Sequence, residues 1–425
     1  MHYFHYRDGR LHCEGVDLEE VAEEHGTPLY VYTAGTILDH YQRLNHSLGG
    51  LPHLICYAVK ANSSRAILRL LHEQGAGFDI VSGGELFRVI AAGGDPARCT
   101  FAGVGKSREE IEYALEQRVF CFNIESEAEL AYINRIARTK NLQAPIALRV
   151  NPDIDAATHK YVSTGRGENK FGIALEGIAS VYESAAAMSN VRICGLQMHI
   201  GSQITEAKPF AAAIAKITPF VLELKERHAI EFVSIGGGMG IVYRSSFASG
   251  QPDWWRVHQH PLTIDEYAGA IVAPLRALRL RILLEPGRFL VGNAGVLLTR
   301  VRYVKEAEQK IFTIVDAGMN DLIRPALYQS YHEIVPVHES PSATRRPVDV
   351  VGPVCESGDF FAQDRALPEM KEGDLVAIMS AGAYGFVMAS NYNSRPLPAE
   401  VLVRGDRFTL VRERQTYEDL VRGEL

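Results

Sequence analysis

The chain has 425 residues, of which 47% are hydrophobic and 22% charged, and its formal net charge is −7. This length allows a large core and two domains, and the composition is ordinary for a globular protein. The acidic balance argues against a nucleic-acid partner, and no apolar stretch reaches the length of a membrane span.

Two further features of the composition predict a cytoplasmic protein. The N-terminal stretch MHYFHYRDGR is polar and aromatic and lacks the apolar segment of a signal peptide. Six cysteines are scattered along the chain without a CxxC pair. This pattern favours reduced thiols over a disulfide framework or a zinc site.

In chain order, the first expected element is a hairpin over residues 2–18, with Asp8–Gly9 at its turn. Eight β-type runs then alternate with amphipathic helical stretches, such as 63–75 and 107–118. Ser126, with Glu129 three residues on, predicts a helix-opening capping box. The eight runs are 53–61, 77–82, 99–103, 119–126, 145–151, 193–200, 231–238 and 281–287.

Eight strand–helix repeats predict a parallel (β/α)8 barrel over residues 27–289. A doubly wound open sheet is the alternative, and the count of eight argues against it. After residue 290, short strands separated by Gly, Pro and Asp turns predict an all-β domain. We expect residues 1–26 to join residues 290–425 in that domain. The long segment 244–262 holds both tryptophans together with His258 and His260, for which no metal is expected.

Polar residues cluster at the ends of the eight runs, where a barrel carries its chemistry. A strand-end lysine usually extends its amine into water, and a lone polar strand end means little. Here many strand ends carry such residues at once. They are Lys60, Asp79, Ser82, Glu125, Arg149, Asn151, His199, Ser202, Gly236, Gly237, Gly238, Glu285 and Arg288.

Together these residues indicate pyridoxal phosphate. Backbone amides in SIGGGMG can approach a phosphate, and barrels often bind phosphate after strands seven and eight. An amine such as that of Lys60 can form a Schiff base. Glu285 could then pair with the ring nitrogen, and His199 could stack on the ring. The ordinary readings are a tight turn for the glycines and a core role for His199.

Several stretches carry a family resemblance over residues 30 to about 395. The chain resembles the barrel-type (fold type III) pyridoxal-phosphate decarboxylases, and most of all those that act on meso-2,6-diaminopimelate. RPALYQSYHEI and CESGD are the more specific matches, whereas YAVKAN and EPGR are shared with ornithine and arginine decarboxylases. The other matches are GAGFDIVSGGEL, GKSREEI, LRVNPDIDAATHKYVSTG, NKFGI, MHIGSQ, SIGGGMGI, DAGMNDLIRPALY, GPVCESGD and AGAYG.

The resemblance implies a role for each matching residue. Lys60 matches the Schiff-base lysine, and Cys355 the acid that a neighbouring subunit supplies to protonate the carbanion. Glu356 matches the residue that holds the distal ammonium. Matches to distal-carboxylate binding are Arg288, Arg324 and Tyr328. Matches to cofactor binding are Asp79, His199, Ser202, Gly236, Gly237, Gly238, Glu285, Gly287, Arg288 and Tyr384, the last of which also reaches the substrate.

The implied activity is decarboxylation at the D-centre of meso-2,6-diaminopimelate to give L-lysine, in a homodimer that shares its active sites. A second substrate carboxylate needs fixed cations, and arginine offers a bidentate fork. Pro325 suits a helix start that puts Arg324 and Tyr328 on one face. The alternatives are an ornithine, arginine or polyamine-precursor decarboxylase, a Schiff-base aldolase, and a non-catalytic regulatory homologue.

Overall fold

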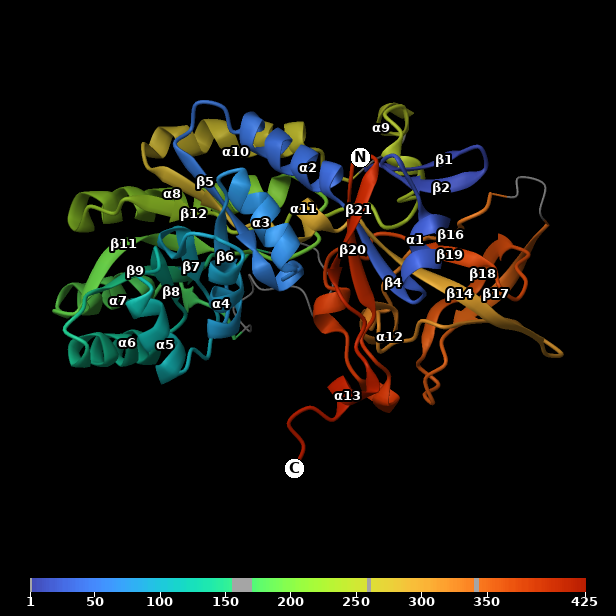
Figure 1. The fold of residues 1–425 in the computed structure, drawn as a ribbon. Helices are drawn as coiled ribbons and strands as arrows, with labels where there is room; N and C mark the ends of the chain where they lie inside the picture. The colour runs from blue at the N-terminus through green and yellow to red at the C-terminus, as the bar shows by residue number, and fades with distance from the viewer. Residues whose placement is uncertain (1, 155–169, 258–260, 340–343) are drawn as a thin grey trace. The chain divides into compact units, whose positions relative to one another are not determined.

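The structure is a computed structural model that describes residues 2–154, 170–257, 261–339 and 344–425 (Figure 1). It divides into two compact units, each assembled from separate stretches of the chain. The barrel unit consists of His40–Ile241 and Pro261–Phe289, and the β unit consists of Met1–Asp39, Val242–His260 and Leu290–Leu425. His258 and His260 lie outside the described residues.

Eight parallel strands form the barrel unit, as the sequence predicts. Seven strand pairs follow the order β9-β11-β12-β13-β5-β6-β7-β8, and the pairing of β8 with β9 closes the barrel. The strands are β5 (His53–Ala58), β6 (Gly77–Ile80), β7 (Cys99–Phe101), β8 (Cys121–Ile124), β9 (Ala144–Asn151), β11 (Val191–Met198), β12 (Phe232–Ser234) and β13 (Arg281–Leu284). The predicted barrel is therefore confirmed, and the open sheet is excluded.

Helices surround these strands and carry the amphipathic pattern seen in the sequence. In α3, for example, Ile67, Leu68, Leu70 and Leu71 are buried. The helices of this unit are α3 (Arg65–Glu73), α4 (Gly83–Ala91), α5 (Arg108–Glu116), α6 (Glu127–Thr139), α7 (Ile178–Ala186), α8 (Lys208–His228) and α10 (Ile264–Leu278). Two more, α2 (Ala34–Ser47) and α11 (Arg288–Val291), cross the unit boundaries, and β10 (Ile173–Ala174) adds a short edge to β9.

The capping box predicted at Ser126 forms only in part. The Ser126 side chain accepts the Glu129 N–H as expected. The Glu129 carboxylate, however, accepts the N–H of Glu125 at 2.7 Å rather than that of Ser126, and it also binds Lys106 Nζ at 2.8 Å. A buried ammonium competes for this carboxylate, and a helix-capping pattern in the sequence cannot show that.

Lys106 is buried, and all three of its donors are used. Its Nζ donates to the carbonyl oxygens of Gly103 and Asn123, each at 2.9 Å, and to Glu129. We expect Lys106→Met to lower the free energy of unfolding by about 3–5 kcal/mol, because the partly buried Glu129 carboxylate and two carbonyl oxygens lose the buried ammonium that binds them. Urea denaturation measures this loss.

The matched control for Lys106 is Lys140→Met, which removes a lysine from solvent-exposed pairs with Glu112 and Glu116. Exposed pairs contribute about 0–1 kcal/mol, so this variant should unfold close to the parent protein. Equal losses in the two variants would contradict a structural role for the buried ammonium.

A mixed sheet forms the β unit, in the order β18-β17-β15-β14-β4-β20-β21, with β19 joining β14 to β16. Its strands are β4 (Leu29–Thr33), β14 (Gly295–Glu306), β15 (Ile311–Val315), β16 (Ile334–Pro336), β17 (Arg345–Val351), β18 (Phe360–Pro368), β19 (Leu375–Ile378), β20 (Ala399–Arg404) and β21 (Arg407–Arg412). Its helices are α1 (Leu18–His25), α9 (Trp254–Val257), α12 (Arg324–Tyr328) and α13 (Tyr417–Leu420).

The predicted N-terminal hairpin is confirmed and belongs to this unit. Strands β1 (Phe4–Arg7) and β2 (Arg10–Cys13) pair in antiparallel register, and β3 (Val16–Asp17) adds to β2. Asp8 and Gly9 have φ values of 51° and 75°, as a tight two-residue turn requires. Phe4 and Leu11 share one buried cluster with residues of β4, β14, β19 and β20.

Two expected boundaries differ from the structure. We expected the barrel to begin at residue 27, yet β4 pairs with β14 and β20 in the β unit. All five β4 residues are buried, so the strand has no polar alternation to show which sheet it joins. Residues Val242–His260 also group with the β unit, although they follow a barrel strand in sequence.

In the described parts of the chain, no helix combines the length and apolar character that a bilayer crossing needs.

Candidate active site

The amine of Lys60 meets a buried carboxylate at the mouth of the barrel. Ala58, the last residue of β5, pairs in register with Asp79 of β6, and Lys60 follows in a short 3₁₀ turn. Lys60 Nζ lies 2.7 Å from Asp79 Oδ2. The Lys60 side chain is 40% exposed and that of Asp79 only 1%, so the amine is anchored but still accessible. Among the described residues, the buried Asp79 Oδ1 has no hydrogen-bond partner.

A second carboxylate, Glu85, lies close to this pair and was not singled out from the sequence. Its Oε2 accepts the Val81 N–H at 2.7 Å, while the Ser82 side chain caps α4. Burial raises the pKa of Glu85 to about 7, and the nearby charge of Lys60 opposes that rise. Glu85 could have been found from the sequence, because it lies three residues after the helix-capping Ser82, just as Glu129 lies three residues after Ser126.

Glu285 is buried after β13 and is held by two neutral donors. Gln197 Nε2 donates to Glu285 Oε2 at 2.8 Å, and Ser234 Oγ donates to Oε1 at 2.7 Å. Burial, and next the charge of Asp79, raise the pKa of Glu285 to about 7. A carboxyl group with this pKa can share a proton with a ring nitrogen at neutral pH.

Gln197 and Ser234 were missed in the sequence because their partner is remote. Gln197 of β11 pairs in register with Ser234 of β12, which pairs with Leu283 of β13. Side chains alternate across a strand, so Glu285 shares a face with Leu283. Gln197 is the next-to-last residue of β11 and Ser234 is the last residue of β12, so a search for polar residues at the last two positions of each strand would have found both.

His199 lies at the end of β11 with its ring anchored by the glycine run. Its Nδ1 accepts the Gly237 N–H at 3.2 Å. Burial lowers the pKa of His199 well below its usual value, and the charges of Arg149 and Lys60 lower it further. The ring is therefore neutral and flat, as stacking on an aromatic cofactor requires. Arg149 is itself paired with Glu125 at 2.8 Å, and both are buried.

The glycines of SIGGGMG bring backbone into close contact. A Cβ on Gly237 would collide with the carbonyl oxygen of Glu285, and one on Gly238 would lie 2.5 Å from that of Gly201. Gly238 also has φ +111°, which disfavours any side chain. The run therefore forms a cradle that only glycine permits.

A hydroxyl and a guanidinium complete this cradle. Ser202 follows Gly201, and its Oγ accepts from Arg288 Nη2 at 3.1 Å. Arg288 is buried, and Gly287 before it packs against Ala58 and Ala61, where a Cβ would come within 3.1 Å of each. Backbone amides, a hydroxyl and an arginine in one small volume are the donors that a phosphate needs. The barrel residues thus fit pyridoxal phosphate.

The remaining predicted residues belong to the β unit. Arg324 opens α12 with Pro325 in its first turn, and its guanidinium carbon lies 5.7 Å from the Tyr328 ring centroid. Arg324 is only 5% exposed, which excludes the surface salt bridge that a lone arginine would suggest. A buried guanidinium on a helix start is suited to bind a carboxylate.

Cys355 and Glu356 are exposed on a loop that Asp359 organises. Asp359 Oδ1 accepts the Met319 N–H at 2.6 Å, and its Oδ2 accepts the Val354 N–H at 2.7 Å. The N–H of Cys355 donates to Asn393 Oδ1 at 2.8 Å. The other five cysteines are buried, so Cys355 is the only one with an accessible thiol.

Tyr384 sits in a strained turn of the AGAYG stretch. Its φ is +57°, which is rare for a non-glycine residue and is often retained at functional sites. A Cβ on Gly382 would collide with the carbonyl oxygen of Val291, so the turn is tightly packed.

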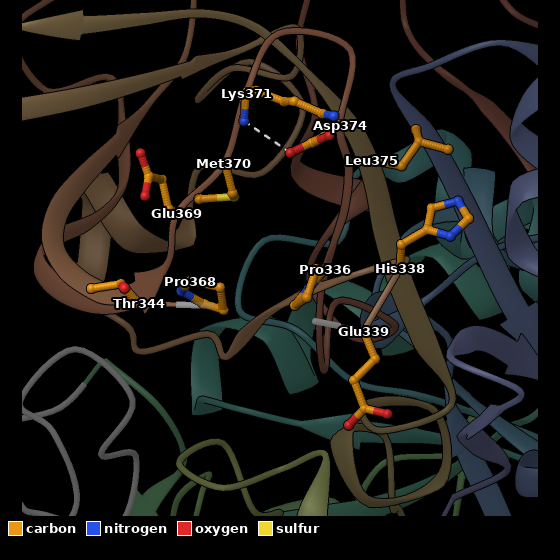
Figure 2. Close-up of a pocket in the computed structure, with 10 residues that line it drawn as sticks. All are labelled: Pro336, His338, Glu339, Thr344, Pro368, Glu369, Met370, Lys371, Asp374 and Leu375. Carbon is orange, nitrogen blue, oxygen red and sulfur yellow. Dashed lines mark hydrogen bonds between the residues drawn. The ribbon is translucent and has the colours of Figure 1, made fainter. Parts of the chain in front are cut away.

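A separate hollow in the β unit contains none of the predicted residues. Figure 2 shows it between Pro336, His338, Glu369 and Lys371. Its volume is about 490 Å³. Its single hydrogen bond between the residues drawn joins the Lys371 N–H to Asp374 Oδ2 at 2.8 Å. It lies away from Lys60 in the sequence, and its described lining residues include no glycine run that could hold a phosphate, so we assign it no part of the site. Within the described chain, no cluster of three or more His, Cys, Asp or Glu residues could hold a metal ion.

Comparisons with known proteins agree with this geometry. Residues 34–292 match the family model described as "Pyridoxal-dependent decarboxylase, pyridoxal binding domain". The chain is 50% identical over 425 residues to a diaminopimelate decarboxylase of Pseudomonas aeruginosa, covering 100% of this chain and 99% of that one.

Two solved structures show the same architecture. The diaminopimelate decarboxylase of Helicobacter pylori complexed with L-lysine is 40% identical, with a TM-score of 0.89, covering 96% of this chain and 98% of that one. The enzyme of M. jannaschii in co-complex with L-lysine is 37% identical, with a TM-score of 0.91, covering 99% and 97%. Both units of the fold are thus present in solved relatives.

Proposed function

Because the chain belongs to the family of pyridoxal-dependent decarboxylases, we propose that the residues described above act on a diamino dicarboxylic acid. The enzyme converts meso-2,6-diaminopimelate to L-lysine and carbon dioxide, with pyridoxal 5′-phosphate as cofactor. The observation that carries this function is the identity of 50% over the whole chain.

Each barrel residue has a definable task toward the cofactor. When bound, pyridoxal phosphate supplies an electron sink for the pair released as the carboxylate leaves. Lys60 Nζ would hold it covalently, and Asp79 would keep that amine in place. Glu285 would pair with the ring nitrogen, and the neutral ring of His199 would cover one face.

The phosphate would lie in the glycine cradle. The N–H groups of Gly236 and Gly237 already donate to Ser234 Oγ and His199 Nδ1, and these two glycines shape the cradle. The phosphate would accept from the Gly238 N–H, the Ser202 hydroxyl and Arg288. Tyr384 would add a hydroxyl, as the family resemblance implies. Together these groups would fix the orientation of the charged end of the cofactor.

Charged residues of opposite sign would recognise the distal carboxylate and the distal ammonium of the substrate. Arg324, with Tyr328 and Arg288, would bind the distal carboxylate, which ornithine and arginine lack at that position. Glu356 would hold the distal ammonium. A substrate without that carboxylate would lose a charge-assisted hydrogen bond to the buried guanidinium of Arg324, at a cost of about 1.5–3 kcal/mol.

The exposed loop of Cys355 and Glu356 supports a homodimer with shared sites. Both side chains face outward on their own subunit, where they could complete the active site of a neighbour. In that arrangement Cys355 Sγ returns a proton to the substrate carbon after carbon dioxide leaves. The buried, free thiols of the other cysteines also suit a reducing compartment, and we place the protein in the cytoplasm.

Cys355→Ala should bind the cofactor normally yet turn over about 10²- to 10⁴-fold more slowly, as expected for loss of a positioned acid. Ser357→Ala, in the same exposed loop, is the matched control and should keep full activity. Absorbance of the cofactor and steady-state lysine formation measure the two effects. Near-normal turnover would rule out this role.

Subunit mixing tests whether Cys355 acts across the dimer. Inactive Lys60→Ala and Cys355→Ala proteins, when combined, should regain about one quarter of the parent activity, because half of the random dimers then contain one intact site. No recovery would place Cys355 in the site of its own subunit.

The function itself is tested by incubating the purified protein and pyridoxal phosphate with meso-diaminopimelate, with ornithine and arginine in parallel. We expect stoichiometric lysine and carbon dioxide from diaminopimelate alone. A product from ornithine or arginine instead would preserve the chemistry and overturn the assignment of Arg324 and Glu356.

A further inference from the structure

His332 lies buried beside Arg324 with both ring nitrogens engaged. The side chain is 0% exposed. Nδ1 lies 2.8 Å from the carbonyl oxygen of Met379, and Nε2 lies 3.4 Å from Arg324 Nε. His332 lies within the RPALYQSYHEI stretch.

The two partners determine which nitrogen carries the proton. A carbonyl oxygen can only accept, so Nδ1 must donate to Met379. An arginine Nε–H can only donate, so Nε2 must accept from Arg324. Both bonds are therefore satisfied by a neutral imidazole protonated on Nδ1.

These contacts also orient the guanidinium of Arg324. Its Nε–H points to His332, and its Nη2 donates to Ser330 Oγ at 3.2 Å. The rings of Tyr243 and Tyr328 lie 5.3 and 5.7 Å from its central carbon. His332 Nε2 and Ser330 Oγ are both neutral acceptors, and together they orient the guanidinium. An end-on fork through Nη1 and Nη2 is the carboxylate approach compatible with these bonds.

The backbone of His332 is also hydrogen-bonded, and its neighbours pack around it. Arg365 Nη1 donates to the His332 carbonyl oxygen at 2.6 Å. The neighbouring Tyr331 ring lies 3.9 Å from the guanidinium carbon of Arg365 and 4.4 Å from that of Arg244. The Tyr243 ring meets the His332 imidazole edge-on at 5.3 Å. The imidazole therefore forms a fixed support for Arg324.

We propose that His332 is a positioning residue that sets substrate specificity: it accepts the Arg324 Nε–H and so turns the Nη1–Nη2 edge toward the distal carboxylate. The Met379 carbonyl keeps the imidazole in the accepting tautomer. This inference rests on the proposed function, because it assumes that Arg324 binds that carboxylate.

Two substitutions separate the accepting nitrogen from the anchoring one. His332→Gln places an amide oxygen near the position of Nε2 and removes the donor to Met379. His332→Asn keeps a donor near the position of Nδ1 and removes the acceptor for Arg324. The proposal predicts that Asn raises the KM for meso-diaminopimelate roughly 10- to 100-fold, the usual effect of losing a hydrogen bond to a charged group. The KM of His332→Gln should stay within a few-fold of that of the parent enzyme, and kcat should change little in either variant.

A purely structural role predicts the opposite ranking, because then the anchor to Met379 matters more. Equal losses in the two variants, or a larger loss in Gln, would overturn the proposal. Cofactor absorbance and the thermal unfolding midpoint show whether each variant is folded and loaded.

A second measurement compares how strongly L-lysine and cadaverine inhibit each variant. It does not require the variants to be saturated with substrate. L-lysine carries the carboxylate that Arg324 would bind, and cadaverine lacks it. His332→Asn should weaken L-lysine binding roughly 10- to 100-fold relative to the parent and leave cadaverine unchanged. Equal weakening of both ligands would overturn the proposal.

The parent protein also reports on the tautomer directly, even if the Asn variant fails to fold. Two-bond ¹⁵N–¹H spectra of histidine-labelled protein, assigned with His332→Gln, should show His332 protonated on Nδ1. Protonation on Nε2 would overturn the inference. If the parent enzyme forms no lysine, both the function and the inference are wrong. If it does and His332→Asn binds L-lysine normally, only the inference is wrong.

Discussion

We expect a Lys60→Ala variant to turn over meso-2,6-diaminopimelate at least about 10⁴-fold more slowly than the parent enzyme. A factor of this size is the upper end of what one positioned group contributes to proton transfer. The reason is geometric: Lys60 Nζ is an accessible amine held 2.7 Å from the buried Asp79, at the carboxyl ends of β5 and β6. No other group at this position can form the bond to the cofactor. Carbon dioxide release and lysine formation measure the loss.

Chemical trapping provides the accompanying measurement. Borohydride reduction of the loaded parent enzyme should fix the cofactor on the peptide that contains Lys60, and mass spectrometry should find no such label in Lys60→Ala. Lys140→Ala, on the outside of the barrel unit, is the control and should keep both label and activity. Label on another lysine in the parent enzyme would show that Lys60 has been misassigned.

The second large effect is expected for Arg324→Met, which removes a buried cation but keeps much of the side-chain volume. We expect kcat/KM for meso-diaminopimelate to fall about 10³- to 10⁴-fold, because the distal carboxylate would then be buried without a partner. Arg324→Lys should recover only part of this loss, since an ammonium cannot form the bidentate fork. Steady-state kinetics with saturating cofactor measure both variants.

Arg302→Met serves as the matched control for Arg324, because Arg302 is an exposed arginine of the same unit, paired with Asp316 at 3.4 Å. Its kinetics should equal those of the parent enzyme. A loss of only a few-fold in Arg324→Met would mean that other residues bind the distal carboxylate. The chemistry at Lys60 would remain, and the substrate assignment would need revision.

Much of the barrel site could be read from local patterns. Lys60, Asp79, His199 and Glu285 were found because each lies at or just after a β-type run, and strand ends in a barrel converge. The glycine run was found because three adjacent glycines after a strand demand a special backbone. The structure adds that a Cβ on Gly237 has no room.

The supporting residues could not be read in the same way. Gln197 and Ser234 bind Glu285 across 88 and 51 positions of sequence, and His332 binds Met379 across 47. Gln197 and Ser234 sit in apolar stretches and His332 in a polar one, and in neither setting does a local pattern show what the side chain contacts. The buried Lys106 likewise takes the Glu129 carboxylate away from the expected capping box.

By itself, the sequence determined the alternation of eight strands and helices, the discontinuous β domain and the chemistry-bearing strand ends, because periodicity, turn residues and caps are properties of neighbouring residues. Only the tertiary structure decided that β4 joins the β sheet, that Gln197 and Ser234 hold Glu285, and that His332 orients Arg324. These features depend on strand register and on side chains that meet after the chain has closed on itself. Burial then gives those contacts their energetic weight, because a buried polar group must find a partner that water would otherwise supply.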